Sequence, residues 1–224
     1  MAEFISNFDW QRLTEMLLGV IPVLICITVH ECCHGLCALA LGDTTAKDMG
    51  RLSLNPIKHF DVLGFIMLMT VGFGWAKPVP VNMRRFAEPK RGMAMTALAG
   101  PASNIVLAAV MLFVYGALYG ALNESAAGYY VLYTVLHTAY LSVSLAVFNI
   151  IPVPPLDGSK VLFSLIPDEA YLKLMRYERY GMLVLMMLIY TGVLSSPLRS
   201  MTGNVFDKLS VFSDLGSRFG GLIY

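Results

Sequence analysis

Charged residues are scarce in this chain. They make up 14% of its 224 residues, while hydrophobic residues make up 57%. An average soluble domain carries about 25% charged residues. The net charge is only +1, so no excess of positive charge indicates a nucleic-acid partner. This composition predicts a body embedded in the lipid bilayer rather than a soluble domain.

Cysteines are also few, and all four lie within residues 26–37. Cysteines this close together exclude a framework of disulfides between distant loops. The chain also lacks a basic segment before its first apolar stretch and a small-residue cleavage pattern after it. We therefore expect that stretch to be retained as a membrane span and not removed as a signal peptide.

Long apolar runs indicate the membrane spans. About 20 apolar residues cross a bilayer as a helix, and such runs occupy residues 16–42, 93–121, 126–151 and 181–198. Residues 62–76 are apolar but short and contain glycine, which favours a re-entrant or partly inserted segment. Residues 159–166 suit a short interfacial helix, and residues 200–224 suit an interfacial segment. The predicted fold is an all-α polytopic helical bundle forming one domain, residues 1–224.

The loops differ in positive charge, which predicts the orientation in the membrane. Residues 43–91 contain eight Lys and Arg, and residues 157–180 contain four more. The turn at residues 122–128 contains none. Cytoplasmic loops carry the excess of Lys and Arg, so we expect a multi-pass protein of the cell membrane with both basic loops in the cytoplasm. The end of the first span then lies on the cytoplasmic side.

Polar residues interrupt the first span. The sequence His30-Glu31-Cys32-Cys33-His34 lies between apolar runs, and the two histidines, four residues apart, share one face of a helix. Zn²⁺ accepts such a pair, and the intervening Glu31 can serve as general base toward water. Structural hydrogen bonding between helices is the alternative, but polar residues inside a span are first candidates for a functional site.

A catalytic zinc site needs a third protein ligand. Asp157 is the strongest candidate, because it follows an apolar span and the proline-rich sequence "IPVPP" and precedes Gly158. Prolines prevent regular helix there, and glycine allows the chain to turn beside the ligand. Asp157 could also cap a short helix, and the two roles are compatible.

These motifs together resemble the site-2 protease family, peptidase family M50, in a compact form without PDZ or CBS domains. The resemblance rests on "HECCH" at 30–34, "GPASN" at 100–104 and "NIIPVPPLDG" at 149–158, and it extends to "LNPIKHFDVLG" at 54–64 and "GWAKPVPVN" at 74–82. It covers most of residues 17–166, in the family's order.

The resemblance implies an intramembrane zinc metalloprotease that hydrolyses peptide bonds in or near transmembrane segments of membrane proteins, in regulated intramembrane proteolysis. It implies one Zn²⁺ per chain held by His30, His34 and Asp157, with Glu31 activating water. Asn149, and by the same analogy Asn104, would contact the substrate backbone or the oxyanion. The "AKPVPVN" segment would be a membrane-associated strand that pairs with the substrate. The implied catalytic core is about 16–166, with an extra span at about 181–198. Nothing in the sequence indicates the oligomeric state.

Other polar residues have weaker claims. His59 and Asp61 fit a function in hydrogen bonding at the membrane interface better than contact with the metal ligands or control of substrate entry. His137 fits a contact between helices better than a metal ligand. On a helical wheel Cys26, Cys33 and Cys37 fall within roughly 60° of His30, while Cys32 points away. This stripe of thiols and imidazoles leaves one alternative function, a membrane metal transporter without hydrolase activity. That alternative leaves the asparagines, the proline run and Asp157 unexplained.

Overall fold

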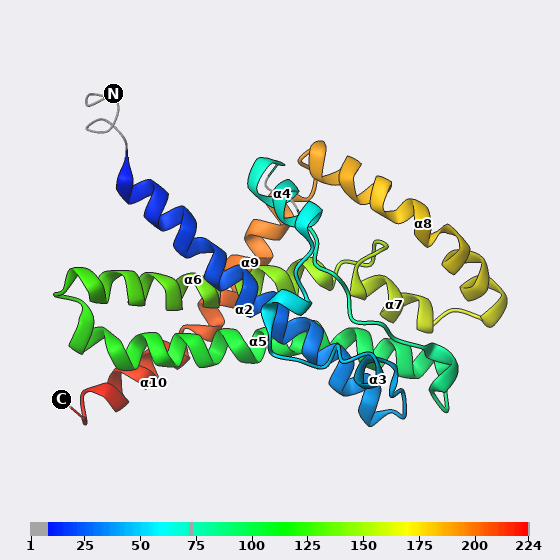
Figure 1. The fold of residues 1–224 in the computed structure, drawn as a ribbon, viewed down its shortest axis with the longest axis horizontal. Coiled ribbons are helices and arrows are strands. Elements are labelled where there is room, and N and C mark those ends of the chain that lie inside the picture. The colour runs from blue at the N-terminus through cyan, green and yellow to red at the C-terminus, as the bar shows by residue number, and fades with distance from the viewer. Residues whose placement is uncertain (1–8, 72–73, 224) are drawn as a thin grey trace.

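The computed structural model describes residues 9–71 and 74–223, and within these ranges the chain is helical and contains no strand (Figure 1). The α-helices are α2 (Trp10–Ala40), α3 (Thr45–Asp48), α4 (Val62–Val71), α5 (Pro89–Leu122), α6 (Ala126–Asn149), α7 (Asp157–Ser164), α8 (Asp168–Tyr190), α9 (Ser195–Leu209) and α10 (Val211–Gly220). Two short 3₁₀ turns, η1 (Pro56–Lys58) and η2 (Met83–Arg85), lie in the loops.

Three of the described helices are long and apolar enough to cross a membrane: Leu18–Ala40 of α2, the whole of α5 and the whole of α6. They agree with the spans predicted at 16–42, 93–121 and 126–151. The all-α polytopic fold is therefore confirmed.

Helix α5 is the centre of the bundle, with α2, α6, α7 and α10 packed against it. Figure 1 shows α5 and α6 running side by side as the two arms of a hairpin, with α10 crossing α5. A side chain at Gly116 of α5 would lie 2.0 Å from the Ser213 carbonyl oxygen, and one at Gly216 of α10 would lie 2.0 Å from the Phe113 carbonyl oxygen. The two backbones therefore meet through small residues on both helices, as packed membrane helices do. The predicted interfacial position of residues 200–224, a range that includes most of α9 and all of α10, stays a prediction.

The stretch predicted as a last span, 181–198, is not one continuous helix. Helix α8 ends at Tyr190, and Gly192 has φ +72°, a left-handed conformation that glycine adopts at helix C-termini. Helix α9 then begins at Ser195 with Pro197 in its first turn, where proline is tolerated. The apolar helices on either side of this break meet at 87°, so together they form either a broken span or a re-entrant loop.

The loop between α2 and α5 contains α4 and, at residues 74–82, a stretch that we call the extended segment. Within the apolar stretch 62–76, Val62–Val71 form the short helix α4, while residues 72–73 lie outside the described residues. Residues 74–82 have no regular structure, so the predicted strand is not present in this structure. Pro78 and Pro80 explain why, since proline cannot donate to a ladder of hydrogen bonds.

Candidate metal centre and active site

Helix α2 presents its two motif histidines on one face. The Nε2 atoms of His30 and His34 lie 3.0 Å apart, and both side chains are buried. Residues four apart on a helix lie one above the other, which explains why the two imidazoles converge. The spacing in the sequence thus accounts for the close approach of the two imidazoles.

Asp157 completes the group from the first turn of α7. Its Oδ2 atom lies 3.1 Å from Nε2 of His30 and 3.1 Å from Nε2 of His34. The three candidate ligand atoms all lie within 4.8 Å of one another and could hold a metal ion. Two imidazoles and one carboxylate, each offering one ligand atom, match the three-ligand donor set of catalytic zinc.

The chain turns sharply to bring Asp157 to α2. A side chain at Gly158 would lie 2.1 Å from the Ile150 carbonyl oxygen, so the residue after Asp157 must be glycine if the turn is to keep its shape. Burial alone would raise the pKa of Asp157, but its hydrogen bonds with His30 and His34 outweigh that effect and hold the pKa well below its usual range. The carboxylate is therefore ionised at neutral pH, as a metal ligand must be.

Helix α5 closes the other side of the centre. A side chain at Gly100 would lie 2.5 Å from Nε2 of His34 and 2.6 Å from Cε1 of His30. The absence of a side chain thus lets α5 contact the two imidazoles directly. The "GPASN" motif is part of the family resemblance, but the sequence alone does not show that its glycine contacts the histidines.

Each of the three candidate ligands also has a partner for its outer polar atom. Nδ1 of His34 lies 2.7 Å from the Thr96 carbonyl oxygen, and Nδ1 of His30 lies 3.2 Å from Nδ2 of Asn104. Oδ1 of Asp157 lies 3.5 Å from Nζ of Lys160. Neither Thr96 nor Lys160 was predicted from the sequence. The i, i+3 spacing of Asp157 and Lys160 on a helix was the available signal for the second of these contacts.

Glu31 contacts the extended segment. Its Oε2 atom accepts a hydrogen bond from the backbone N–H of Val79, with a distance of 2.7 Å between nitrogen and oxygen. The Lys77 N–H donates to the His59 carbonyl, and the Asn82 N–H donates to Oδ2 of Asp43. The segment is therefore fixed beside the motif helix by three of its backbone donors.

The same segment has little capacity left for pairing with another strand. One guanidinium nitrogen of Arg51 donates to the carbonyls of Lys77 (2.9 Å) and Pro78 (3.2 Å). Pro78 and Pro80 have no N–H, and the N–H of Val79 between them is bonded to Glu31. Strand addition to the substrate would therefore have to use other backbone groups of the segment.

The two asparagines from the motifs lie in different surroundings. Asn104 is completely buried beside His30. Asn149 is at the last turn of α6, where its Nδ2 donates to the Leu145 carbonyl of the same helix. A contact between Asn149 and a substrate would require that side chain to rotate.

The polar residues given weaker claims lie outside the candidate centre. His59 is buried, with Nε2 2.8 Å from the Ser53 carbonyl oxygen, and Asp61 accepts from the Gly64 N–H at the start of α4. His137 stacks on Tyr133 of its own helix. Cys26 donates to the Thr138 carbonyl and Cys32 to the Ser53 carbonyl. Among the described residues, the group that could hold a metal contains no cysteine.

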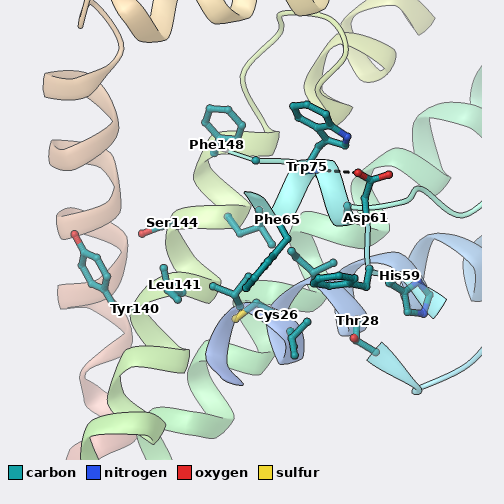
Figure 2. A pocket seen from close by; sticks show the side chains of 18 of the residues that line it. Cys26, Thr28, His59, Asp61, Phe65, Trp75, Tyr140, Leu141, Ser144 and Phe148 are labelled. Atoms are coloured by element: carbon teal, nitrogen blue, oxygen red, sulfur yellow. Dashed lines mark hydrogen bonds between the residues drawn. The ribbon is translucent and has the colours of Figure 1, made fainter. Parts of the chain in front are cut away.

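An apolar cavity of about 480 Å³ lies next to the motif helix, between α2, α4, α6 and the junction of α8 and α9 (Figure 2). Its lining includes the aromatic rings of Phe65, Trp75 and Phe148. It reaches α2 at residues 23–28 and includes none of the three candidate ligands. The cavity and the metal centre are therefore neighbouring but separate features.

Comparison with known proteins agrees with the motifs. Residues 118–192 match the family model described as "Peptidase family M50". This match contains Asp157 and Asn149 but not the histidine motif. No solved structure gives a significant match.

Curated relatives match over nearly the whole chain. "Putative zinc metalloprotease YwhC" of Bacillus subtilis (strain 168) is 35% identical over 211 residues, which are 93% of this chain and 96% of that protein. "Putative zinc metalloprotease Rip2" of Mycolicibacterium smegmatis is 28% identical over 92% of this chain and 79% of its own length. "Putative zinc metalloprotease Rip2" of Mycobacterium tuberculosis (strain H37Rv) is 25% identical over 84% of this chain and 72% of its own length. The chain therefore belongs to peptidase family M50, the site-2 family of intramembrane zinc metalloproteases that its motifs resemble.

Proposed function

We propose that this chain is an intramembrane zinc endopeptidase in which His30, His34 and Asp157 hold one Zn²⁺ and Glu31 is the general base. The observation that carries the proposal is the convergence of the three ligand atoms, with Oδ2 of Asp157 3.1 Å from both imidazoles. The donor set fits zinc, and a catalytic site of this kind leaves a coordination position for the reaction.

Zinc supplies polarisation of the scissile carbonyl and activation of the attacking water. The Val79 N–H fixes Oε2 of Glu31, so we assign proton transfer to Oε1. Glu31 takes a proton from the attacking water and then delivers it to the leaving amine. We retain Asn149 as the residue that contacts the substrate backbone after its side chain turns away from Leu145.

The proposed substrates are transmembrane segments of membrane proteins. A helix hides its carbonyls in its own hydrogen bonds, so the substrate must unwind near the centre before cleavage. The position of the motif supports such a substrate, because His30 and His34 lie ten and six residues before Ala40, the end of the first span. At 1.5 Å per residue they lie about 15 and 9 Å inside that end.

We infer that this end of the span faces the cytoplasm and that the protein lies in the cell membrane. The support is the eight Lys and Arg of residues 43–91, which directly follow the span. Water then reaches the centre from the cytoplasmic side. We further propose a single domain over 1–224 with its catalytic core at about 16–166, acting in regulated intramembrane proteolysis.

The first experiment compares wild type with Glu31→Gln in detergent, measuring zinc content and cleavage of a panel of single-span peptides. Glu124→Gln, at an exposed turn, is the matched control. We expect about one zinc per chain in all three proteins and cleavage by wild type and Glu124→Gln only. Cleavage by Glu31→Gln at the wild-type rate would exclude Glu31 as the base, and wild type without zinc would exclude the metal centre.

The rival function, a metal transporter using the cysteine stripe, is not favoured. Cys26 is committed to a hydrogen bond with the Thr138 carbonyl. A triple variant distinguishes the two functions. Replacing three cysteines (Cys26→Ser, Cys33→Ser and Cys37→Ser) should leave cleavage intact in a protease and abolish soft-metal transport in a carrier. Loss of cleavage with zinc retained would instead mean that the protease needs one or more of these cysteines.

A further inference from the structure

Asn104 has an amide oxygen without a partner. The residue lies on α5 and is completely buried, and its Nδ2 faces Nδ1 of His30 at 3.2 Å. Among the residues that the structure describes, none donates a hydrogen bond to its Oδ1, although that atom too is buried. Buried polar atoms nearly always have a partner, so this unpartnered oxygen requires an explanation.

The chemistry of a metal-binding imidazole supplies one. Nε2 of His30 faces Oδ2 of Asp157, so its lone pair is the one directed into the candidate centre. An imidazole that binds a metal through Nε2 carries its proton on Nδ1, and that proton needs an acceptor. The two ends of an asparagine amide have nearly the same shape, and a 180° rotation of the Asn104 amide places Oδ1 where Nδ1 of His30 can donate to it.

We propose that Asn104 is a positioning residue of the metal centre, whose Oδ1 accepts the Nδ1–H of His30 and so fixes the tautomer and ring plane in which Nε2 binds the metal. This inference rests on the proposed function of His30 as a zinc ligand. It replaces the expected contact between Asn104 and the substrate or its oxyanion. The two functions need opposite ends of the amide, because an oxyanion requires the N–H donors and His30 requires the oxygen.

The second histidine has a matching arrangement from the same helix. Nδ1 of His34 lies 2.7 Å from the Thr96 carbonyl oxygen, which can only accept and therefore fixes the tautomer of His34. Thr96, Gly100 and Asn104 are spaced four residues apart on α5, so they lie along one face of that helix. This face thus offers one acceptor to each imidazole, with the glycine between them allowing the close approach.

The backbone at Asn104 is also tied to its surroundings. The hydroxyl of Ser142 on α6 donates to the Asn104 carbonyl at 2.9 Å. The neighbouring Ser103 instead donates to the Gly100 carbonyl within α5. Ser103 therefore provides a matched control at an adjacent position on the same helix.

The test uses Asn104→Asp, which keeps an acceptor and removes the N–H donors, and Asn104→Leu, which has neither. Ser103→Ala is the control. Zinc affinity is measured by competition with a chelator, and kcat and KM are measured on a single-span peptide. We expect Asn104→Leu to bind zinc about 10- to 100-fold more weakly, and Asn104→Asp and Ser103→Ala to stay within a few-fold of wild type in both zinc affinity and kcat.

Asn104→Asp decides the question even if Asn104→Leu fails to fold, because it preserves the shape of the side chain. Zinc and cleavage both retained in Asn104→Asp support the positioning function. In Asn104→Asp, zinc retained with cleavage lost favours the oxyanion function and overturns the inference, and so does loss of zinc. In a folded Asn104→Leu, zinc affinity equal to that of wild type also overturns it. Failure of wild type itself to bind zinc would instead refute the proposed function and this inference with it.

Discussion

The backbone N–H of Val79 donates a hydrogen bond to Oε2 of Glu31, with a nitrogen–oxygen distance of 2.7 Å. This contact joins the carboxylate assigned as general base to a segment 48 residues further along the chain. A hydrogen bond to a charged group contributes about 1.5–3 kcal/mol. The extended segment is therefore part of the geometry of the base and not only a neighbour of it.

Removing this donor should slow catalysis. Val79→Pro deletes the N–H, and Val79→Ala keeps it while removing the same buried side chain. We expect kcat for Val79→Pro to fall about ten- to a hundredfold below that of Val79→Ala, with zinc content unchanged. A higher kcat in Val79→Pro would instead mean that the contact restrains Glu31, and equal rates would mean that the donor has no effect on the base.

Gly100→Ala should disrupt the metal centre. Its methyl group would lie 2.5 Å from Nε2 of His34, a distance that forces the imidazole or α5 to move. Gly120→Ala on the same helix is the control, because nothing lies within 4 Å of the added carbon. We expect zinc affinity to fall at least tenfold in Gly100→Ala and to stay unchanged in Gly120→Ala. Full zinc affinity in Gly100→Ala would show that the imidazoles can shift without loss of the site.

Arg51 should control how firmly the extended segment is held. Its guanidinium donates to the carbonyls of Lys77 and Pro78, and methionine at this position would keep the length of the side chain without these donors. We expect hydrogen exchange at residues 76–82 to be faster in Arg51→Met than in Arg84→Met, which changes an exposed arginine of η2. Identical exchange in the two variants would assign the ordering of the segment to its bonds with Glu31, Asp43 and the His59 carbonyl.

Asp43 should make stability depend on pH. Burial raises the pKa of Asp43, but hydrogen bonds from Thr45 and the Asn82 N–H, with Arg85 nearby, outweigh this and leave it lower than usual. A lowered folded-state pKa gives a stabilisation that is present above the unfolded pKa of about 3.9 and is lost as the pH falls through the folded value.

The measurement is the difference in melting temperature between wild type and Asp43→Asn, followed from neutral pH down to about pH 2. The difference should favour wild type from neutral pH down to about 5 and should shrink between about pH 4 and 2. Asp214→Asn, at an exposed position in α10, is the control. A difference that does not change with pH would mean that the hydrogen bonds of Asp43, and not its charge, stabilise the loop.

The side chains of the centre could be predicted from the sequence, and several backbone contacts could not. His30, Glu31 and His34 follow from helical spacing, and Asp157 follows from the need for a third ligand near a proline-rich turn. The Thr96 carbonyl and the Val79 N–H are backbone groups that every residue has, so no letter of the sequence marks them. Only the packing of α5 and the loop against α2 selects them.

At two places the described backbone differs from the regular element expected, and both places had a visible signal in the sequence. The apolar run at 181–198 contains Gly192, which ends α8, and Pro197, which suits the first turn of a new helix. The strand expected at 76–82 contains Pro78 and Pro80, which argue against a paired strand. The first expectation followed the hydrophobic pattern and the second followed the family resemblance, while the backbone follows the local turn residues and prolines.

The proposed ligands His30 and Asp157 are 127 residues apart in the chain, and they join the first membrane span to the short helix that follows the third. A zinc ion bound here would consequently cross-link these two elements as well as take part in the reaction. Closing a loop of this length stabilises the folded state by about 5 kcal/mol, because the unfolded chain loses conformational entropy. The stabilisation is smaller in a membrane protein whose helices stay inserted when it unfolds. Chelation should therefore stop the chemistry and also weaken the connection between α7 and α2, leaving α7 held mainly by its packing against α5.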